Sequence, residues 1–256
     1  MAEPLLVVDS VTLRFGGVTA LDDVSFDVRA GELFAVIGPN GAGKTSIFNC
    51  LNGVYRPQNG SIRLDGTELI GRAPTQVAGM GVARTFQNLG LFTNLTVVDN
   101  LMLGRHVLMG TGFLAGALWF GKARREEVEH RRRCEEIVEL LELEAYRKHP
   151  VGALPYGIQK RIELGRALAM DPRLLLLDEP VAGMNLEETE DMARYILETR
   201  EQLDLSMILV EHDMHMVMDI ADRVSVLDFG RVIATGPPDE VQADPKVIEA
   251  YLGQAS

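Results

Sequence analysis

The spacing of apolar and polar residues changes several times along this chain. At the N-terminal end, Leu5–Val8 and Val11–Phe15 have the character of strands, Gly16-Gly17 forms a turn, and Val24–Val28 alternates apolar with polar residues. The next run, Leu33–Ile37, is wholly apolar, which is typical of a strand that is buried on both faces. The first part of the chain is therefore predicted to form short strands.

A helix and a hairpin are predicted next. A glycine-rich segment follows Leu33–Ile37 and leads into a helix from about Lys44 to Asn52. Gly60–Leu64 is then predicted to be one strand of a hairpin. Its turn would be Asp65-Gly66, because this dipeptide suits a turn whose central residues have positive φ.

The middle of the chain, from Pro74 to about Ala169, has a mostly helical pattern. Within it, Lys122–His149 predicts a long charged helix or a pair of helices, and its arginine and glutamate runs are interpreted as a solvated face. One buried stripe is expected along this segment, formed by Val128, Ile137, Leu140, Leu141 and Leu143.

The C-terminal half alternates between short apolar runs and longer amphipathic segments. Gly230 is expected to start a final hairpin. Strands that alternate with helices favour an α/β fold with a mostly parallel sheet, which a helical block at about residues 88–165 interrupts. The predicted strands and helices of this half are Leu174–Leu177, Leu186–Leu203, Met207–Val210, Met214–Ala221 and Val224–Leu227.

Composition narrows the classes of function. Of the 256 residues 46% are apolar, which is enough for a folded core, and the formal net charge of −12 disfavours a nucleic-acid partner. Cys50 and Cys134 lie far apart, so zinc and disulfide sites are disfavoured. Met1–Val8 has no signal-peptide pattern, and Val107–Gly121, an uncharged run of 15 residues, is too short to span a bilayer. If the protein works at a membrane, other chains are expected to supply the spans.

The segment after Leu33–Ile37 has the spacing of a phosphate-binding loop. It fits GxxxxGK[ST] and lies between a predicted buried strand and a predicted helix, which is the context that this motif requires. Lys44 would reach the β- and γ-phosphates of a nucleotide, and the Thr45 hydroxyl would bind Mg²⁺. An ordinary glycine-rich turn is the alternative interpretation. The predicted ATP-binding residues of this loop are Gly38, Pro39, Asn40, Gly41, Ala42, Gly43, Lys44, Thr45 and Ser46.

Two acids and a histidine end other apolar runs. Asp178-Glu179 follows Leu174–Leu177, at the kind of strand end where ligands gather in a parallel sheet. Asp178 suits the Mg²⁺ shell, and Glu179 suits a general base that orients or deprotonates an attacking water. His212 follows the next strand and would hydrogen-bond the γ-phosphate. Taken singly, the acids are also compatible with a common strand end, and the histidine with a polar surface residue.

These motifs, together with others in the same order, make the chain resemble the ABC ATPase family over nearly its whole length. Phe15 stands where an aromatic residue stacks on adenine, and Gln87, in Arg84-Thr-Phe-Gln87, matches the glutamine that senses Mg²⁺ and the membrane partner. His212 matches the switch histidine. The family's signature position is occupied by Leu154, Pro155, Tyr156, Gly157 and Ile158. The loop that crosses the dimer interface is matched by Ala182, Gly183, Met184 and Asn185.

The resemblance implies an α/β P-loop NTPase core with a mostly parallel sheet, an antiparallel β subdomain and an inserted α-helical subdomain. We expect one domain over residues 4–253, with the core at about 4–87 and 166–240, the helical subdomain at about 88–165 and a C-terminal tail at 241–256. ATP and Mg²⁺ would be the ligands. Catalysis would depend on Glu179, His212 and Gln87, and the metal would be held at Thr45, Gln87 and Asp178.

More narrowly, the chain is similar to ATPase subunits of importers for branched-chain (hydrophobic) amino acids. The similarity rests on Ile37–Asn49, Arg84–Asn100, the signature tyrosine, Glu211-His-Asp213 and the ending Val247–Gly253. It implies a peripheral protein at the cytoplasmic face of the cell membrane, with two transmembrane permease subunits and, indirectly, a substrate-binding protein. The alternatives are the ATPase of a lipopolysaccharide-type or other ABC exporter, and a soluble ABC protein without a transport role.

The signature departs from the family's usual Leu-Ser-Gly-Gly-Gln. Serine is replaced by Pro155, the first glycine by Tyr156 and the final glutamine by Ile158. In this family two ATPases enclose two ATPs, and each signature faces the phosphate loop of the other subunit. In the usual signature, the serine can donate hydrogen bonds to the γ-phosphate from its backbone N–H and its hydroxyl. Pro155 has neither group, so it cannot supply these hydrogen bonds. We therefore expect a heterodimer with a second, related ATPase.

Overall fold

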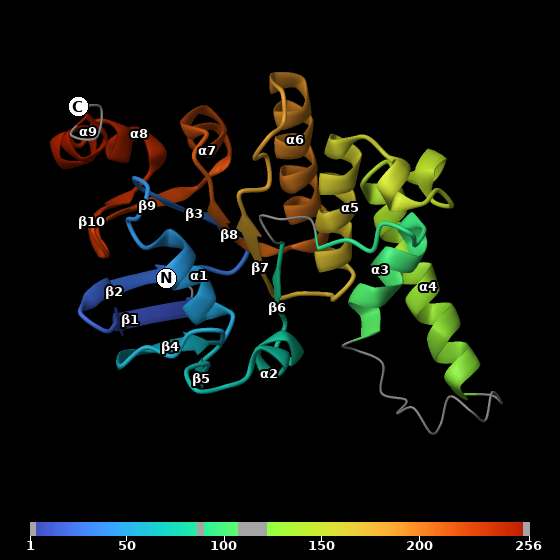
Figure 1. Cartoon of the computed structure of the whole chain (residues 1–256), viewed down its shortest axis with the longest axis horizontal. Coiled ribbons are helices and arrows are strands. Elements are labelled where there is room, and N and C mark those ends of the chain that lie inside the picture. Colours follow the sequence, from blue (N-terminus) through green and yellow to red (C-terminus); the bar gives the residue numbers. More distant parts are fainter. Residues whose placement is uncertain (1–3, 86–89, 107–121, 253–256) are drawn as a thin grey trace.

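The computed structural model describes residues 4–85, 90–106 and 122–252, and it shows an α/β fold in which helices surround two β-sheets (Figure 1). The larger sheet has six strands in the order β10-β9-β3-β8-β7-β6, and all neighbours are parallel except β10 and β9. Its strands are β3 (Leu33–Ile37), β6 (Val82–Arg84), β7 (Leu174–Asp178), β8 (Ser206–Val210), β9 (Arg223–Asp228) and β10 (Arg231–Gly236).

Strand β3 lies between two hydrophobic clusters. Leu33, Ala35 and Ile37 belong to one cluster, and Phe34 and Val36 belong to the other. Since successive side chains of a strand point to opposite faces, both faces of the sheet are covered at β3. This confirms the interpretation of the wholly apolar run.

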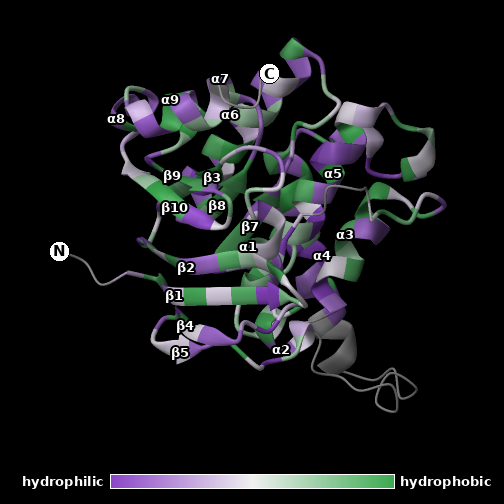
Figure 2. Ribbon diagram, turned by 60° about the vertical axis from the view of Figure 1, so that its left-hand side comes forward, coloured by the Kyte–Doolittle hydropathy of each residue, from purple (hydrophilic) through white to green (hydrophobic). Residues whose placement is uncertain are grey.

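The second sheet is antiparallel and has the order β2-β1-β4-β5. The two strands expected in the first fifteen residues are one strand with an irregularity at Ser10, whose φ is 52°. Figure 2 shows hydrophobic and hydrophilic residues alternating along β1. The turn at Asp65-Gly66 is confirmed, with φ values of 48° and 71°. The strands are β1 (Leu6–Phe15), β2 (Val18–Val28), β4 (Asn59–Leu64) and β5 (Thr67–Glu68).

Helices α3 (Val97–Arg105), α4 (Lys122–Leu140) and α5 (Tyr156–Leu168) form a group beside β7 and β6, on the side of the molecule away from β10 (Figure 1). Short 3₁₀ turns follow α4 at η2 (Glu144–Tyr146) and η3 (Val151–Ala153). The remaining helices are α1 (Lys44–Leu51), α2 (Pro74–Gly79), α6 (Leu186–Leu203), α7 (Met214–Ile220), α8 (Pro238–Gln242) and α9 (Pro245–Leu252). Among the described residues, none of these helices is both long and apolar enough to cross a membrane.

The buried stripe expected along the middle of the chain is wrong at two of its residues, Val128 and Leu140. Val128 is 63% exposed, because the buried face of α4 runs through His130, Cys134 and Ile137, and a position two residues before His130 points the opposite way. Leu140 is only half-buried, and α4 ends there, so the segment expected to be one long helix or a pair of helices contains α4 and the short 3₁₀ turn η2. The stretch expected to be mostly helical also contains β6, whose three residues are too few to show a strand pattern.

Candidate nucleotide-binding site

The phosphate loop connects β3 to α1, as its spacing predicts. Gly38 has φ 147°, and a Cβ added there would lie 2.0 Å from the carbonyl oxygen of Leu227. Gly43 has φ 108°, and its Cβ would lie 2.7 Å from the carbonyl oxygen of Ala20. Both positions therefore require glycine, and the loop folds closely over its neighbours.

Two other segments hold the loop in place from the side of the sheet. The N–H of Gly230, in the turn between β9 and β10, donates to the Ala42 carbonyl across 2.9 Å. The carbonyl of Gly230 in turn accepts from the N–H of Asp22 in β2, across 2.8 Å. The loop is thus attached to both sheets.

Lys44 is a buried residue of this loop. Its Nζ donates to the carbonyl oxygens of Gly38 and Pro39, at 2.5 and 2.9 Å. Burial lowers the pKa of Lys44, and the nearby charge of Glu179 acts in the opposite direction. The ammonium therefore lies in the middle of the loop, where bound phosphate oxygens would balance its positive charge.

A cavity of about 290 Å³ joins the loop to residues from distant parts of the chain. The predicted loop residues Asn40–Ser46, Glu179 and His212 all line it, so the structure brings these predictions together at one place. Val18, Thr19 and Ala20 of β2 complete the lining.

Glu179 and His212 follow the neighbouring parallel strands β7 and β8, so they reach the same edge of the sheet. Oε1 of Glu179 lies 3.0 Å from Nε2 of His212. The backbone of Glu179 has φ 48°, and its N–H donates to the carbonyl of Val210 across 2.9 Å. This places a carboxylate and an imidazole in contact at the wall of the cavity.

Asp178 is buried beside them and forms an ion pair with Arg84. Nη2 of Arg84 lies 2.6 Å from Oδ2 of Asp178, and Nη1 donates to Oδ1 of Asn49 in α1 across 2.7 Å. The side chains of both Arg84 and Asp178 are 7% exposed. Arg84 therefore connects β6, β7 and the helix that follows the phosphate loop.

Phe15 is at the edge of the cavity rather than in its lining. It pairs with Val18 across the turn between β1 and β2, and Val18 lines the cavity. The ring is 47% exposed and packs edge-on against Tyr55, with 5.1 Å between centroids. An exposed aromatic face in this position is available for stacking.

The predicted signature lies beside the predicted interface loop of the same chain, not beside its own phosphate loop. Pro155 is the N-cap of α5, which begins at Tyr156 and not at Lys160 as expected. The Tyr156 hydroxyl donates to the carbonyl of Ala182 across 3.0 Å. A Cβ on Gly157 would lie 2.7 Å from Oε1 of Glu188, so this glycine packs directly against the first turn of α6.

The interface loop itself ends as the cap of α6. Oδ1 of Asn185 accepts from the N–H of Glu188 across 3.0 Å, and Oε2 of Glu188 accepts from the N–H of Asn185 across 3.1 Å. This reciprocal capping box fixes the start of α6 at the predicted residue, Leu186. Gly183 takes a φ of 80° just before it.

Comparison with known proteins decides the family. Residues 21–182 match the ABC transporter family, and residues 231–256 match the branched-chain amino acid ATP-binding cassette transporter family. The chain belongs to the ABC transporter family. It is 42% identical to the high-affinity branched-chain amino acid transport ATP-binding protein BraF of Pseudomonas aeruginosa, over 100% of both chains. It is 40% identical to LivG of Escherichia coli, a protein of the same description, again over 100% of both chains.

Solved ABC structures have the same fold. The crystal structure of a nucleotide-free ATP-binding cassette from an ABC transporter matches with a TM-score of 0.84 and 28% identity, over 97% of this chain and 99% of that one. The ADP conformation of an ATP-binding cassette matches with a TM-score of 0.86 and 29% identity, over 98% of this chain and 100% of that one. The expected α/β fold of an ABC ATPase is therefore confirmed.

Two sequence predictions fall on residues whose structure is not described. Gln87 and the apolar run Val107–Gly121 both lie outside the described ranges. Conversely, Arg84 and Glu211 have no predicted role, although both lie in segments that carry the family resemblance. Their positions could have indicated a role. Arg84 ends β6 and Glu211 directly follows β8, and charged residues at such strand ends lie at the edge of the sheet where a nucleotide binds.

Proposed function

We propose that this chain binds ATP with Mg²⁺ and hydrolyses it to power the import of branched-chain or other hydrophobic amino acids or related small organic solutes. One observation carries the proposal: the phosphate loop, Glu179 and His212 line a single cavity in a protein whose full-length relatives are named as branched-chain amino acid transport ATP-binding proteins. Those names favour import over the export alternative. A soluble ABC protein without a transport role is disfavoured on the same ground.

The residues of the site suit distinct tasks. The N–H groups of the phosphate loop and the ammonium of Lys44 would hold the β- and γ-phosphates. Glu179 would take a proton from, or orient, the attacking water, and His212, in contact with it, would bond the γ-phosphate. Phe15 would stack on adenine.

The oxygen donors here fit Mg²⁺. Thr45 lines the cavity and carries a hydroxyl, and Asp178 ends β7 with a carboxylate; hydroxyl and carboxylate oxygens are the ligands that Mg²⁺ prefers. Gln87 is proposed as a further metal contact. When bound, the ion would neutralise charge on the phosphates. The chain's own contribution is to hold Asp178 in a fixed position through Arg84.

Glu179→Gln tests this function. The amide keeps the size and position of the side chain but cannot accept a proton, so ATP affinity should remain while turnover falls by about 10²–10⁴-fold. The measurement is ATP binding and ATP hydrolysis by the complex that co-purifies with the chain from native membranes. If the variant hydrolyses ATP at the wild-type rate, the proposed role of Glu179 is wrong.

We propose that the chain works as a peripheral subunit on the cytoplasmic face of the membrane, with two permease subunits and, through them, a substrate-binding protein. In this proposal the chain is divided into a core at about 4–87 and 166–240, a helical subdomain at about 88–165 and a tail from 241, and the helical part would face the permease. Phe92 and Leu95, just before α3, are 57% and 37% exposed. A cysteine at Leu91 should crosslink to a permease loop; crosslinks only between ATPase subunits would count against docking there.

We also propose a heterodimer with a second ABC ATPase. Pro155 provides no hydroxyl at the N-terminus of α5, whereas the loop, Glu179 and His212 of this chain are intact. The ATP that faces this chain's signature should therefore turn over more slowly than the ATP in this chain's own loop. Disabling Lys44 should then abolish more activity than disabling the partner's loop lysine. A stable and fully active homodimer of this chain would refute the proposal.

A further inference from the structure

Glu211 is a buried carboxylate that joins two loops of the site. It follows the last residue of β8 and is 3% exposed. Oε1 accepts from the N–H of Val181 across 2.9 Å, and Oε2 accepts from the N–H of His212 across 2.9 Å. The main chain of Asp213 also acts to lower the pKa of this carboxyl group. Both oxygens are thus bonded to backbone groups.

These donors belong to the two segments that carry the predicted catalytic pair. Val181 lies two residues after Glu179, in the loop that follows β7. His212 lies in the loop that follows β8, and its ring is 3.0 Å from the Glu179 carboxylate. Glu179 and His212 line the cavity, whereas Glu211 does not. Glu211 therefore fixes the main chains on both sides of the pair without reaching the nucleotide space itself.

A contribution to the stability of the fold does not explain why a carboxylate is buried at Glu211. Burial raises the pKa of Glu211; the three main-chain groups act against this rise, and the charge of Glu179 adds to it. A carboxyl group with a raised pKa in the folded protein stabilises the fold most below its ordinary value of about 4.3, and that contribution is lost as the pH rises. The raised pKa of Glu211 therefore adds no stability to the fold as the pH rises, and its contacts with the two loops remain as the reason for its position.

We propose that Glu211 is a positioning residue for ATP hydrolysis: it holds the loop of Glu179 and the loop of His212 at a fixed separation, so that base and imidazole meet at the attacking water. This inference rests on the proposed function, since it concerns the same pair. A glutamine at this position would keep the volume but would place an NH₂ group against a main-chain N–H donor. One of the two loop contacts would then be lost.

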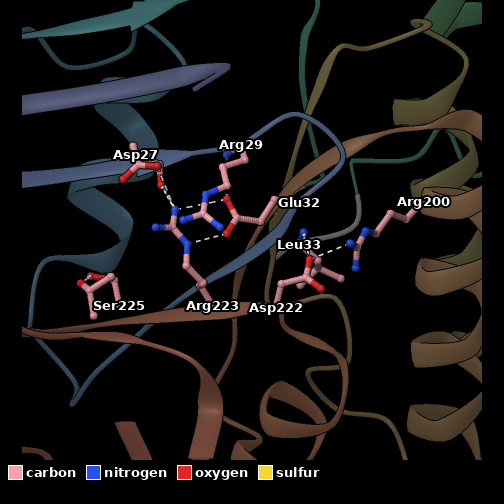
Figure 3. Close-up of polar contacts among 9 residues, drawn as sticks. Asp27, Arg29, Glu32, Leu33, Arg200, Asp222, Arg223 and Ser225 are labelled. Carbon is pink, nitrogen blue, oxygen red and sulfur yellow. Dashed lines mark hydrogen bonds and ion pairs between the residues drawn. The ribbon is translucent and has the colours of Figure 1, made fainter. Parts of the chain in front are cut away.

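Glu32 provides a matched control, because it is also a buried carboxylate, 5% exposed. It lies at the opposite edge of the sheet, where β3 and β9 begin, and its Oε1 accepts from Nε of Arg223 across 2.5 Å (Figure 3). Its Oε2 accepts from the N–H of Arg29 across 2.7 Å. Glu32 has the burial and the backbone bond of Glu211, but it does not touch the site.

The experiment compares Glu211→Gln and Glu32→Gln in the assembled complex, with ATP affinity, kcat, KM and thermal unfolding measured for each. We expect Glu211→Gln to lower kcat by about ten- to a hundredfold, as small displacements of catalytic groups do, with ATP affinity within about twofold of wild type. Glu32→Gln should lower the unfolding temperature and leave kcat per ATP-binding site unchanged. Glu211→Asp, which keeps an acceptor, should recover part of the lost kcat.

A double variant separates the possible outcomes. If Glu211 acts through Glu179, Glu179→Gln with Glu211→Gln should be no slower than Glu179→Gln alone. Additive losses, or a loss of rate that only matches lost ATP-binding capacity, would show a structural role and overturn the inference. Wild-type kcat in Glu211→Gln, with Glu179→Gln inactive, would overturn the inference but leave the proposed function standing. Wild-type kcat in Glu179→Gln would overturn the function itself.

Discussion

Arg84 and Asp178 are separated by 94 positions in the sequence, yet they form an ion pair of 2.6 Å that is almost entirely shielded from water. The same guanidinium lies over the ring of Phe48, with 5.6 Å from its central carbon to the ring centroid. The carboxylate that we assign to Mg²⁺ is therefore held by a residue from the strand that leads into the Gln87 segment. The position of the Asp178 carboxylate therefore depends on β6, β7 and α1 together.

Replacing Arg84 with Met should destabilise the chain by about 3–5 kcal/mol, because it leaves the Asp178 charge buried without this partner. Arg84→Lys should lose less, since it keeps the charge but cannot reach Asp178 and Asn49 with one planar group. Urea unfolding measures both losses. Asn49→Ala is the control, as it removes only the neutral contact. A Met variant as stable as wild type would contradict the importance of the pair.

Gly38→Ala should destabilise the phosphate loop and abolish ATP binding. The new Cβ would meet the Leu227 carbonyl at 2.0 Å, so the loop must move. A strained backbone conformation of this kind costs about 1–3 kcal/mol before the clash is counted. Gly17→Ala is the matched control, because its Cβ would have no heavy atom within 4 Å. ATP affinity that is unchanged in Gly38→Ala would show that the loop tolerates a side chain there.

Pro155→Ser should strengthen the start of α5 and the site that this helix serves. A serine at the N-cap accepts from an N–H in the first turn and stabilises a helix by about 0.5–2 kcal/mol. It also restores the hydroxyl that the opposite ATP would meet. We expect a higher unfolding temperature and faster ATP hydrolysis when Lys44 is disabled and only that opposite site works. Pro155→Ala, which has no hydroxyl, should raise neither quantity; equal gains in both variants would refute the explanation.

Asp171 should contribute stability that disappears in acid. Burial alone would raise its pKa, but hydrogen bonds from Arg105 and Arg133 outweigh burial and hold the pKa of Asp171 below its ordinary value. A lowered pKa means that the stabilisation is present above the unfolded value, about 3.9, and is lost as the pH falls below it. The unfolding temperatures of wild type and Asp171→Asn should therefore differ at pH 7 and approach each other as the pH falls below about 3.9.

The exposed pair of Asp65 and Arg173 supplies the comparison for that measurement. Its partners are 65% and 52% exposed, so Asp65→Asn should change little at either pH. A gap between wild type and Asp171→Asn that stays constant with pH would show that the ion pairs of Asp171 are not responsible for its contribution.

Local patterns predicted those elements that depend on their own residues. The bounds of α6 were predicted as Leu186–Leu203, because an apolar stripe follows a residue that can cap the helix, and Asn185 does so. Strands β3, β7 and β8 were predicted within about a residue, because buried parallel strands are continuous apolar runs.

What could not be predicted depends on which distant segments become neighbours. The contact of Arg84 with Asp178 exists because β6 pairs with β7, and no spacing within either strand specifies that pairing. Likewise, Glu211 meets Val181 only because β7 and β8 are adjacent. The exposure of Val128, by contrast, follows from α4 itself: Val128 lies about two and a half helical turns before Ile137, so the two side chains point to opposite faces.

The hydrogen bonds between α5 and the segment after β7 have a consequence for the coupling between the two ATP sites of the proposed dimer. Tyr156 holds the Ala182 carbonyl, and Nζ of Lys160 lies 3.4 Å from the carbonyl oxygen of Glu179. In the proposed dimer, α5 would face the nucleotide bound by the partner subunit. The same helix is hydrogen-bonded to the main chain at Glu179, the proposed base for the nucleotide in this chain's own loop. A tilt of α5 at one site would therefore shift the base at the other, so each ATPase subunit would itself couple the two nucleotide sites.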